Sequence, residues 1–385
     1  MNTQELSELL LTLNQVKQDV MGAFLYALQN KRRCWAHMLW GQPGIGKTAI
    51  SKEIAKEVGA ALGEHVRFHA MASSTAEPWD FAGALMRAKE GNYSEYVPLR
   101  WIYEASETFP DQSPMIILLD DFPTAHPQTQ AAALKLVHEL RAGEHIIRNN
   151  VLILCAGNYS TDNSGAHSML KAMGNRFRHL HARADKDVFV SYGRKNGVHP
   201  LILAYLEVQP QNLFDFDPNG AEDAFPSPRS WENLSDFLHE RGRTVIDPRA
   251  FEYYPQIAGI VGRGAAITFA AFAEHAMSAI SPELICKDPM KAPMPPANEP
   301  DIVWATIVAL EDHIKNHPLD WSNAVKYSVR TGINEDIGIL IMSAAGEVLQ
   351  RMAQKDKIAQ IAKYVDLLTA GQEKFGDVLN FVYNN

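Results

Sequence analysis

The stretch GQPGIGKT at residues 41–48 constrains the fold of this chain more than any other feature of its sequence. It matches the pattern G-x-x-x-x-G-K-[ST] and stands between a strand-like run and a helix-like one. Glycines at these positions let backbone N–H groups curl around a phosphate chain, and the helix N-terminus adds the positive end of its dipole. The sequence therefore predicts a strand, a phosphate-binding loop and a helix in direct succession, rather than a plain glycine-rich turn.

Two side chains of this loop carry the predicted chemistry. Lys47 is expected to reach the β and γ phosphates of a nucleotide, and Thr48 is expected to bind Mg²⁺. The predicted ATP-binding residues are Gly41, Gln42, Pro43, Gly44, Ile45, Gly46, Lys47, Thr48 and Ala49. The loop alone does not separate ATP from GTP, nor kinases from motors and switches.

A second signal is the pair of carboxylates that ends the apolar run MIILLDD. Asp120 is expected to hold Mg²⁺, and Asp121 to orient or deprotonate an attacking water. The alternative is a strand end followed by a solvated acidic turn. Many hydrolases of this type carry Glu at the second position, and aspartate is one methylene shorter, so Asp121 is expected to hold the water less well.

A third signal is Asn158, which follows the apolar run VLILCAG. An Asn at the end of a strand beside the carboxylates is suited to a hydrogen bond with the γ-phosphate or the lytic water. Asn after Gly is also a common turn residue, so Asn158 gains its weight from its place in the order of the signals.

Four short apolar runs alternate with longer amphipathic ones, which is typical of an α/β fold with a mostly parallel sheet. The expected strands are residues 34–40, 65–71, 115–120 and 151–157. Residues 4–30 have apolar positions at helical spacing, which predicts two amphipathic helices. Beyond about residue 186 helices are expected to dominate. Five prolines within residues 289–300 interrupt them.

Composition narrows the class of protein. A net charge of −9 argues against a dedicated duplex-DNA binder, although a local basic channel is not excluded. The first residues lack the pattern of a signal peptide, and no apolar stretch has the length of a membrane span. Cys34, Cys155 and Cys286 are widely spaced, without the paired spacing of zinc motifs or disulfides. A cytoplasmic protein without a membrane partner is the expectation.

The order Lys47, Asp120, Asp121, Asn158 and Arg176 resembles that of AAA+ ATPases, and most closely the MoxR-like group, which is related to the ATPase subunits of metal chelatases. In that family, an arginine after the sensor-one strand reaches the γ-phosphate in the neighbouring subunit. The resemblance assigns this role to Arg176 in NRFRH, with Arg178 and then Arg183 as rivals. A surface arginine beside a strand is the alternative.

Two further segments match the family. Residues 74–105 occupy the place of its helix-two insert, which commonly faces the pore of the ring, the alternative being an ordinary surface excursion. Residues 225–238 resemble its sensor-two region, where Pro228 opens a helix and Arg229 would reach the γ-phosphate of its own chain's nucleotide. Because an arginine in a first helical turn opposes the helix dipole, a nearby anion would explain it, although a plain surface arginine is the alternative.

The resemblance implies a P-loop NTPase αβα core with a parallel sheet over residues 1–185, an all-helical AAA+ lid over 186–290 and a C-terminal helical module over 301–385. It implies a homo-oligomeric, hexameric ring that uses ATP and Mg²⁺ to remodel a protein, as a chaperone does. A von Willebrand factor A-like partner often accompanies such rings. Two alternatives are a nucleic-acid-associated AAA+ motor or loader and a monomeric P-loop kinase or switch.

Overall fold

The described part of the chain folds into two compact units. The computed structural model describes residues 9–162, 169, 171–241, 253–276, 278–328, 330, 341, 344–346 and 348. The first unit contains the described residues up to Val188, together with Phe214–Ala221 and Ser227–Arg229. The second contains Phe189–Leu213, Glu222–Pro226 and the described residues from Ser230 onward.

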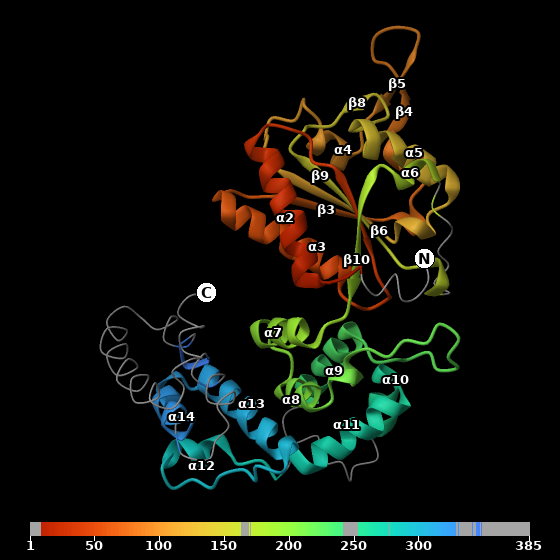
Figure 1. The fold of residues 1–385 in the computed structure, drawn as a ribbon. Helices are drawn as coiled ribbons and strands as arrows, with labels where there is room; N and C mark the ends of the chain where they lie inside the picture. Colours follow the sequence, from red (N-terminus) through yellow and green to blue (C-terminus); the bar gives the residue numbers. More distant parts are fainter. Residues whose placement is uncertain are drawn as a thin grey trace. The chain divides into compact units, whose positions relative to one another are not determined.

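A six-stranded parallel sheet forms the centre of the first unit, in the order β1-β10-β2-β9-β6-β3 (Figure 1). Its strands are β1 (Leu10–Thr12), β2 (Ala36–Trp40), β3 (Arg67–Ala72), β6 (Met115–Asp120), β9 (Val151–Gly157) and β10 (Phe177–Arg183). Every neighbouring pair is parallel, so all six carboxyl ends lie at one edge of the sheet. The predicted α/β class with a parallel sheet and a helical C-terminal region is confirmed.

Helices cover both faces of this sheet, as alternation of apolar side chains along the central strands requires. Leu39, Ile116 and Leu152 pack with α2 (Leu13–Gln29) and α3 (Lys47–Leu62) on one face. The neighbouring residues Met38 and Ile117 pack on the other face. The helices on that face are α4 (Arg100–Ala105), α5 (Pro127–Glu139) and α6 (Lys171–Gly174).

The structure differs from the sequence-based expectation near the N-terminus. Within the described part of residues 4–30, a short strand, β1, precedes the single helix α2, where two helices were expected. Thr12 ends the strand and caps the helix: its Oγ1 accepts from Gln15 N at 3.3 Å, and Gln15 Oε1 accepts from Thr12 N at 2.8 Å. Helical spacing did not indicate β1 because three residues are too few to establish a period.

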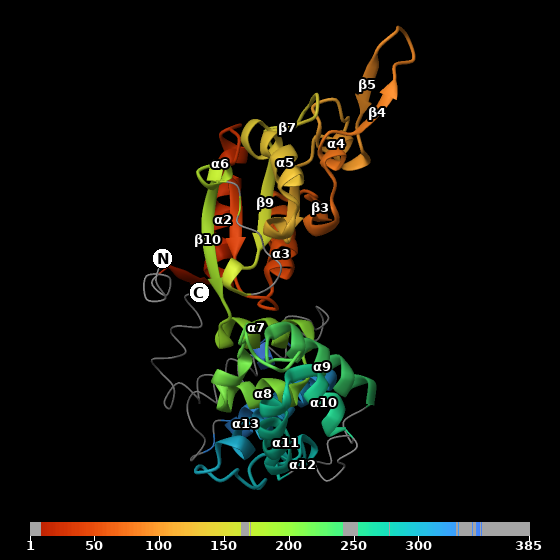
Figure 2. The ribbon, with the colours of Figure 1, turned by 90° about the vertical axis from the view of Figure 1, so that its right-hand side faces the viewer.

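The segment that resembles a helix-two insert carries a projecting hairpin. Its strands β4 (Ala84–Arg87) and β5 (Ser94–Val97) pair antiparallel and extend away from the central sheet in both ribbon views (Figure 2). Two 3-10 turns, Ser73–Thr75 and Pro78–Phe81, lead into it. Leu85, Met86 and Tyr93 are exposed large apolar residues on or beside the hairpin.

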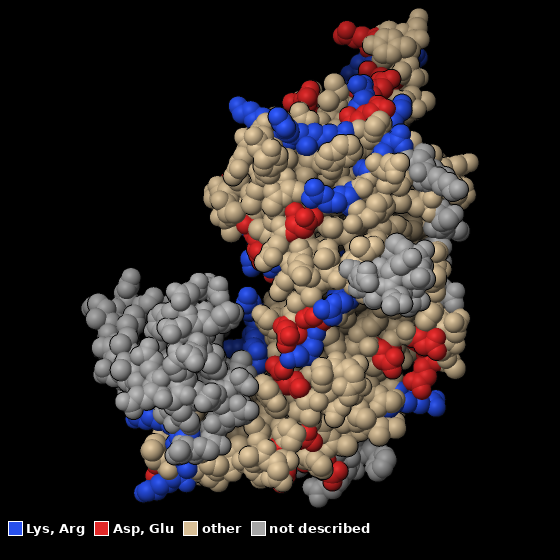
Figure 3. All heavy atoms as spheres, viewed as in Figure 1, with Lys and Arg blue, Asp and Glu red and all other residues tan. Residues whose placement is uncertain are grey.

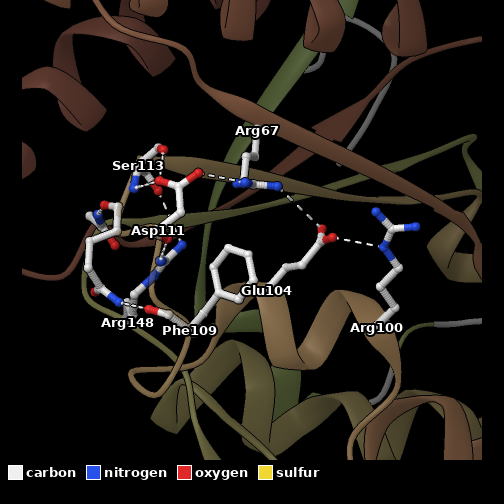
Figure 4. Close-up of polar contacts among 9 residues, drawn as sticks. Arg67, Arg100, Glu104, Phe109, Asp111, Ser113 and Arg148 are labelled. Carbon is white, nitrogen blue, oxygen red and sulfur yellow. Dashed lines mark hydrogen bonds and ion pairs between the residues drawn. The ribbon is translucent and has the colours of Figure 1, made fainter.

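The loop that leads into β6 is held by arginines at the amino edge of the sheet (Figure 4). Arg148 donates to the carbonyls of Asp111 at 2.6 Å and Ser113 at 3.1 Å, and only 3% of this residue is exposed. Arg67, at the start of β3, bonds the Asp111 carboxylate at 2.5 Å. These bonds fix the point where the strand that ends in the paired aspartates begins. The small hairpin β7 (Arg141–Ala142) and β8 (His145–Ile146) precedes Arg148.

The described second unit is helical. Tyr205, Trp231 and Phe269 form an aromatic core among its helices, with ring centroids 5.3–5.8 Å apart. Its helices are α7 (Lys186–Asn196), which begins in the first unit, α8 (Pro200–Val208), α9 (Pro228–Arg241), α10 (Tyr254–Val261), α11 (Arg263–Ala276), α12 (Pro282–Lys287), α13 (Pro300–Asn316) and α14 (Trp321–Ser328). No helix among the described residues is long and apolar enough to span a bilayer.

The start of the predicted C-terminal module packs against helices that precede it. Helix α13 contacts α8 and α11, and Ile307, Val308 and Leu310 are buried. A second apolar cluster joins α12, α13 and α14 around Trp321. The division at residues 185, 290 and 301 stays a prediction, and much of residues 329–385 lies outside the described residues.

Candidate nucleotide-binding and hydrolysis site

Three adjacent strands deliver the predicted site residues to one edge of the sheet. The order β2-β9-β6 places the loop after Trp40, Asn158 after β9 and Asp120 at the end of β6 side by side. Because parallel strands end at the same edge, polar residues that follow buried strands meet there. This edge is the place where open α/β sheets bind ligands.

The glycine loop adopts a backbone that other residues would not tolerate. Gly44 and Gly46 have φ angles of 81° and 106°, in the left-handed region. A Cβ atom on Gly44 would lie only 2.7 Å from Ser227 Oγ. Gly46 stands at the N-cap of α3 and no side chain caps that helix. The amides of its first turn are therefore suited to a phosphate group.

Lys47 lies at the centre of the site. Its Nζ donates to Gly41 O at 2.7 Å, Gln42 O at 3.0 Å and Asn158 Oδ1 at 2.7 Å. Burial lowers the pKa of Lys47 to about 8, although the charges of Asp120 and Asp121 act to raise it. The structure thus brings Lys47 and Asn158 together, as both were predicted to lie near one nucleotide.

The two predicted magnesium ligands are also in contact. Thr48 Oγ1 donates to Asp120 Oδ2 at 2.6 Å. Oxygen ligands from a hydroxyl and a carboxylate are those that Mg²⁺ prefers. In the described structure this pair supplies oxygen ligands that fit Mg²⁺. The uncapped start of α3, next to it, supplies N–H groups that suit a phosphate.

Asp121 lies next to this pair in an unusual conformation. Its φ of 50° is left-handed, which Asp tolerates better than most residues, and its N–H donates to Asp120 Oδ1 at 3.1 Å. Desolvation and the charge of Asp120 raise the pKa of the Asp121 carboxyl. A raised pKa brings a carboxylate closer to the range in which it accepts a proton from water.

Arg229 joins the same site from a distant part of the sequence. Its backbone N–H donates to Gly44 O at 3.1 Å, and Pro228 opens helix α9 as predicted. The Arg229 charge acts to lower the pKa of both Lys47 and Asp121, after larger contributions from desolvation. Arg229 therefore lies beside the nucleotide loop, within the first unit.

Arg176 is the predicted site residue that the fold places elsewhere. It directly precedes β10, whose Phe177 pairs with Ala36 at the start of β2. The loop at 41–48 follows the other end of β2, about 13 Å away along the strands. Arg176 thus lies at the amino edge of the sheet and the nucleotide loop at the carboxyl edge.

The two rival arginines form ion pairs within the chain, and Arg176 also has contacts there. Arg178 pairs with Asp19 of α2 at 3.3 Å, and Arg183 pairs with Asp185 at 3.1 Å. Arg183 ends β10 and therefore lies at the carboxyl edge, unlike Arg176.

Two residues of the site were not predicted from the sequence. Asp162 is buried, accepts from Tyr159 N at 3.0 Å and acts to raise the pKa of Lys47. Ser227 packs against Gly44. The only sequence signals were an acidic residue four positions after Asn158 and a serine beside Pro228, and neither forms a pattern without the fold.

Comparison with known proteins agrees with this geometry. Residues 37–180 match the family model described as "ATPase family associated with various cellular activities (AAA)". The first unit therefore contains an AAA ATPase family domain, with the AAA+ P-loop NTPase fold. No curated protein sequence matches the chain.

Solved structures resemble the fold at low identity. The Thermotoga maritima RuvB Holliday junction branch migration motor is 12% identical with a TM-score of 0.35, covering 68% of this chain and 70% of its own. Aeropyrum pernix ORC1, solved in complex with DNA, is 13% identical with a TM-score of 0.37, covering 88% and 84%. Brucella abortus NtrX is 13% identical with a TM-score of 0.37, covering 91% and 67%. Likenesses this distant do not indicate what this chain binds.

Proposed function

We propose that this chain is a ring-forming ATPase of the MoxR-like type, which couples hydrolysis of ATP to remodelling of a protein partner. The observation that carries the proposal is the division of its predicted catalytic residues between the two edges of one sheet. Lys47, Thr48, Asp120, Asp121 and Asn158 share the carboxyl edge, while Arg176 stands at the amino edge. A finger at that position serves a neighbour's nucleotide rather than its own.

The nucleotide site would work by charge neutralisation and by orientation of water. Lys47 would exchange its bonds to backbone carbonyls for the β and γ phosphates, and Thr48 and Asp120 would hold Mg²⁺. Bound Mg²⁺ neutralises charge that develops on the phosphate oxygens. Asp121 would accept a proton from the attacking water, and Asn158, released from Lys47, would orient that water or the γ-phosphate.

Two arginines would complete the site around the γ-phosphate. Arg229, whose backbone is bonded to the nucleotide loop, would act in its own chain. Arg176 would reach the site from the next subunit, where a fixed guanidinium stabilises negative charge in the transition state. Such a requirement couples hydrolysis to assembly, which favours a homo-oligomeric ring, of hexameric type in this family.

A protein is the better candidate for the remodelled partner than a nucleic acid. The β4–β5 hairpin presents Leu85, Met86 and Tyr93 to solvent, and apolar side chains of this kind suit a polypeptide. On the face drawn in Figure 3, both units carry Asp and Glu among their Lys and Arg side chains. A nucleic-acid motor needs a concentrated surplus of basic residues. The von Willebrand factor A-like partner and the cytoplasmic location rest on the family resemblance and the sequence alone.

Electron microscopy of the purified chain with a slowly hydrolysed ATP analogue tests the proposal, together with an ATPase assay. The expected result is a closed ring with the β4–β5 hairpins at its pore and Mg²⁺-dependent ATPase activity. A protein that stays monomeric with bound nucleotide would favour the kinase or switch alternative. Stimulation of ATPase activity by DNA or RNA, but not by unfolded protein, would favour the nucleic-acid motor.

A further inference from the structure

The second unit contains a cluster of side chains of metal-ligand type, remote in sequence from the nucleotide motifs. Cys286 stands in the last turn of α12, His313 in the last turn of α13 and Asp320 at the end of the 3-10 turn Pro318–Asp320. One ligand atom from each lies within 4.8 Å of the other two. Within the described residues, this is the one group of three or more such side chains that is close enough to hold an ion.

His313 is the member of this cluster that packing alone does not explain. Its side chain is 5% exposed, and Nε2 lies 2.9 Å from Asp320 Oδ2. Its Nδ1 is buried without a hydrogen-bond partner among the described residues, 3.8 Å from Glu283 Oε1. Buried polar atoms are normally satisfied, so packing alone does not account for the position of this imidazole.

We propose that Cys286, His313 and Asp320 bind a divalent transition-metal ion of the zinc type, which ties helix α12 to the end of helix α13. A thiolate and an imidazole favour Zn²⁺ or Co²⁺ over Mg²⁺ and Ca²⁺, which prefer oxygen. Metal–ligand bonds of about 2.0–2.3 Å place neighbouring ligand atoms about 3.3–3.8 Å apart. The cluster would need only small side-chain shifts to reach that spacing.

Glu283 is assigned to the outer sphere of this site. If Nε2 of His313 binds the ion, the ring proton must sit on Nδ1, and the Glu283 carboxylate is placed to accept it. Metal-binding histidines commonly donate their second N–H to a carboxylate in this way. With the proton on Nδ1, a small shift of the Glu283 carboxylate from its distance of 3.8 Å would complete this hydrogen bond.

The ion would serve as a staple rather than as a reaction centre. Cys286 and His313 flank the proline-containing segment 289–300, which has no helix before Pro300. Binding of a metal to residues on both sides of an irregular segment stabilises the folded state, because the unfolded chain offers no such site. The inference does not depend on the proposed ATPase function.

Titration of the nucleotide-free full-length protein with Co²⁺ tests the proposal, because a cobalt–thiolate bond has a strong near-ultraviolet absorption. We expect one equivalent of Co²⁺ to produce this absorption, and Zn²⁺ to displace it. Cys286→Ser should abolish the absorption, whereas Cys34→Ser, at another buried cysteine, should keep it. The nucleotide site has no thiolate among its predicted ligands, so Co²⁺ bound there would not absorb in this way.

Substitutions outside the apolar core keep the test decisive if Cys286→Ser does not fold. Asp320→Asn should lower the Co²⁺ affinity on the order of 10-fold or more, and Glu283→Gln should lower it about 10-fold while keeping the absorption. Circular dichroism checks that each variant is folded. A wild-type protein without the thiolate absorption at saturating Co²⁺, or an absorption that persists in Cys286→Ser, would overturn the proposal.

Discussion

At the residue scale, the protonation of the buried Lys47 should make nucleotide binding sensitive to pH. It is 8% exposed, and burial lowers its pKa to about 8 despite two aspartates nearby. Binding of a polyanion requires the charged form, which predominates below this pKa. At higher pH the free protein carries a neutral lysine, and binding must take up a proton.

The affinity for ATP is therefore expected to fall as pH rises through 8. With Lys47 as the titrating group, the dissociation constant should rise about fourfold by pH 8.5 and about tenfold by pH 9, relative to pH 7. Binding of a fluorescent ATP analogue across this range measures the effect. In Lys47→Arg the pH dependence should disappear even if binding is weaker overall, because arginine does not deprotonate there.

Asp121 gives a second prediction at this scale. Asp121→Asn should bind ATP but hydrolyse it slowly, since the amide does not accept a proton from water. Asp121→Glu should hydrolyse ATP several-fold faster than the natural protein, because the longer side chain restores the reach of the usual glutamate. Single-turnover hydrolysis measures both variants. Normal turnover by Asp121→Asn would remove Asp121 from its assigned role.

At the element scale, the four apolar runs predicted as strands correspond to β2, β3, β6 and β9. Strands β2, β6 and β9 are central and almost wholly buried, so they appear in the sequence as largely continuous apolar runs. Strand β3 lies at the edge of the sheet and is only partly buried. Strand β10 was not predicted because its sequence FRHLHAR alternates Arg and His with only three buried residues, Phe177, Leu180 and Ala182. A strand with one partly polar face resembles a loop when only its composition is considered.

The metal-type cluster was beyond sequence reasoning for a related reason. Zinc motifs are recognised by cysteines and histidines that lie close together in sequence. Cys286 and His313 lie far apart in sequence, and the fold of α12 against α13 brings them together. The nucleotide motifs, by contrast, follow strands directly, so their meeting at one sheet edge could be predicted.

Arg148 provides a stability prediction for the loop that leads into β6. Arg148→Met keeps most of the side-chain volume but leaves the carbonyls of Asp111 and Ser113 without their donor. Loss of these bonds should cost about 2 kcal/mol and lower the midpoint of thermal unfolding by about 4–8 °C. Differential scanning calorimetry measures the shift.

Arg100→Met is the matched control for this prediction. Arg100 also appears in Figure 4, but its side chain is 91% exposed and pairs with Glu104 at 2.8 Å. Exposed pairs contribute little to stability, so Arg100→Met should shift the midpoint by less than about 2 °C. Equal shifts in the two variants would contradict the role given to Arg148.

At the scale of the whole molecule, the position of Arg176 links the candidate nucleotide site to the proposed ring. The order of motifs suggested a finger, but its distance from the chain's own nucleotide loop depends on the parallel pairing of β10 with β2. That pairing could not be predicted, because β10 itself was not predicted as a strand. With this pairing, Arg176 lies about 13 Å along the strands from the nucleotide loop of its own chain, which favours the proposed role in a neighbouring subunit.

The most direct test of the proposed ring mixes two inactive proteins, Arg176→Ala and Asp121→Asn. Arg176→Ala should bind ATP through its intact loop but hydrolyse it on the order of 10³-fold more slowly. In a mixed ring, some interfaces pair the intact catalytic site of Arg176→Ala with the intact finger of Asp121→Asn. ATPase activity should therefore partly return on mixing, under conditions shown to exchange subunits.

The control for this measurement is the double variant Arg176→Ala/Asp121→Asn mixed with either single variant, in which no interface has both an intact site and an intact finger. These mixtures should stay inactive at every ratio. Recovery of ATPase activity in the mixture of single variants alone is the result that the account predicts. Absence of recovery at any ratio, with subunit exchange demonstrated, would contradict a role for Arg176 in the neighbouring subunit's site.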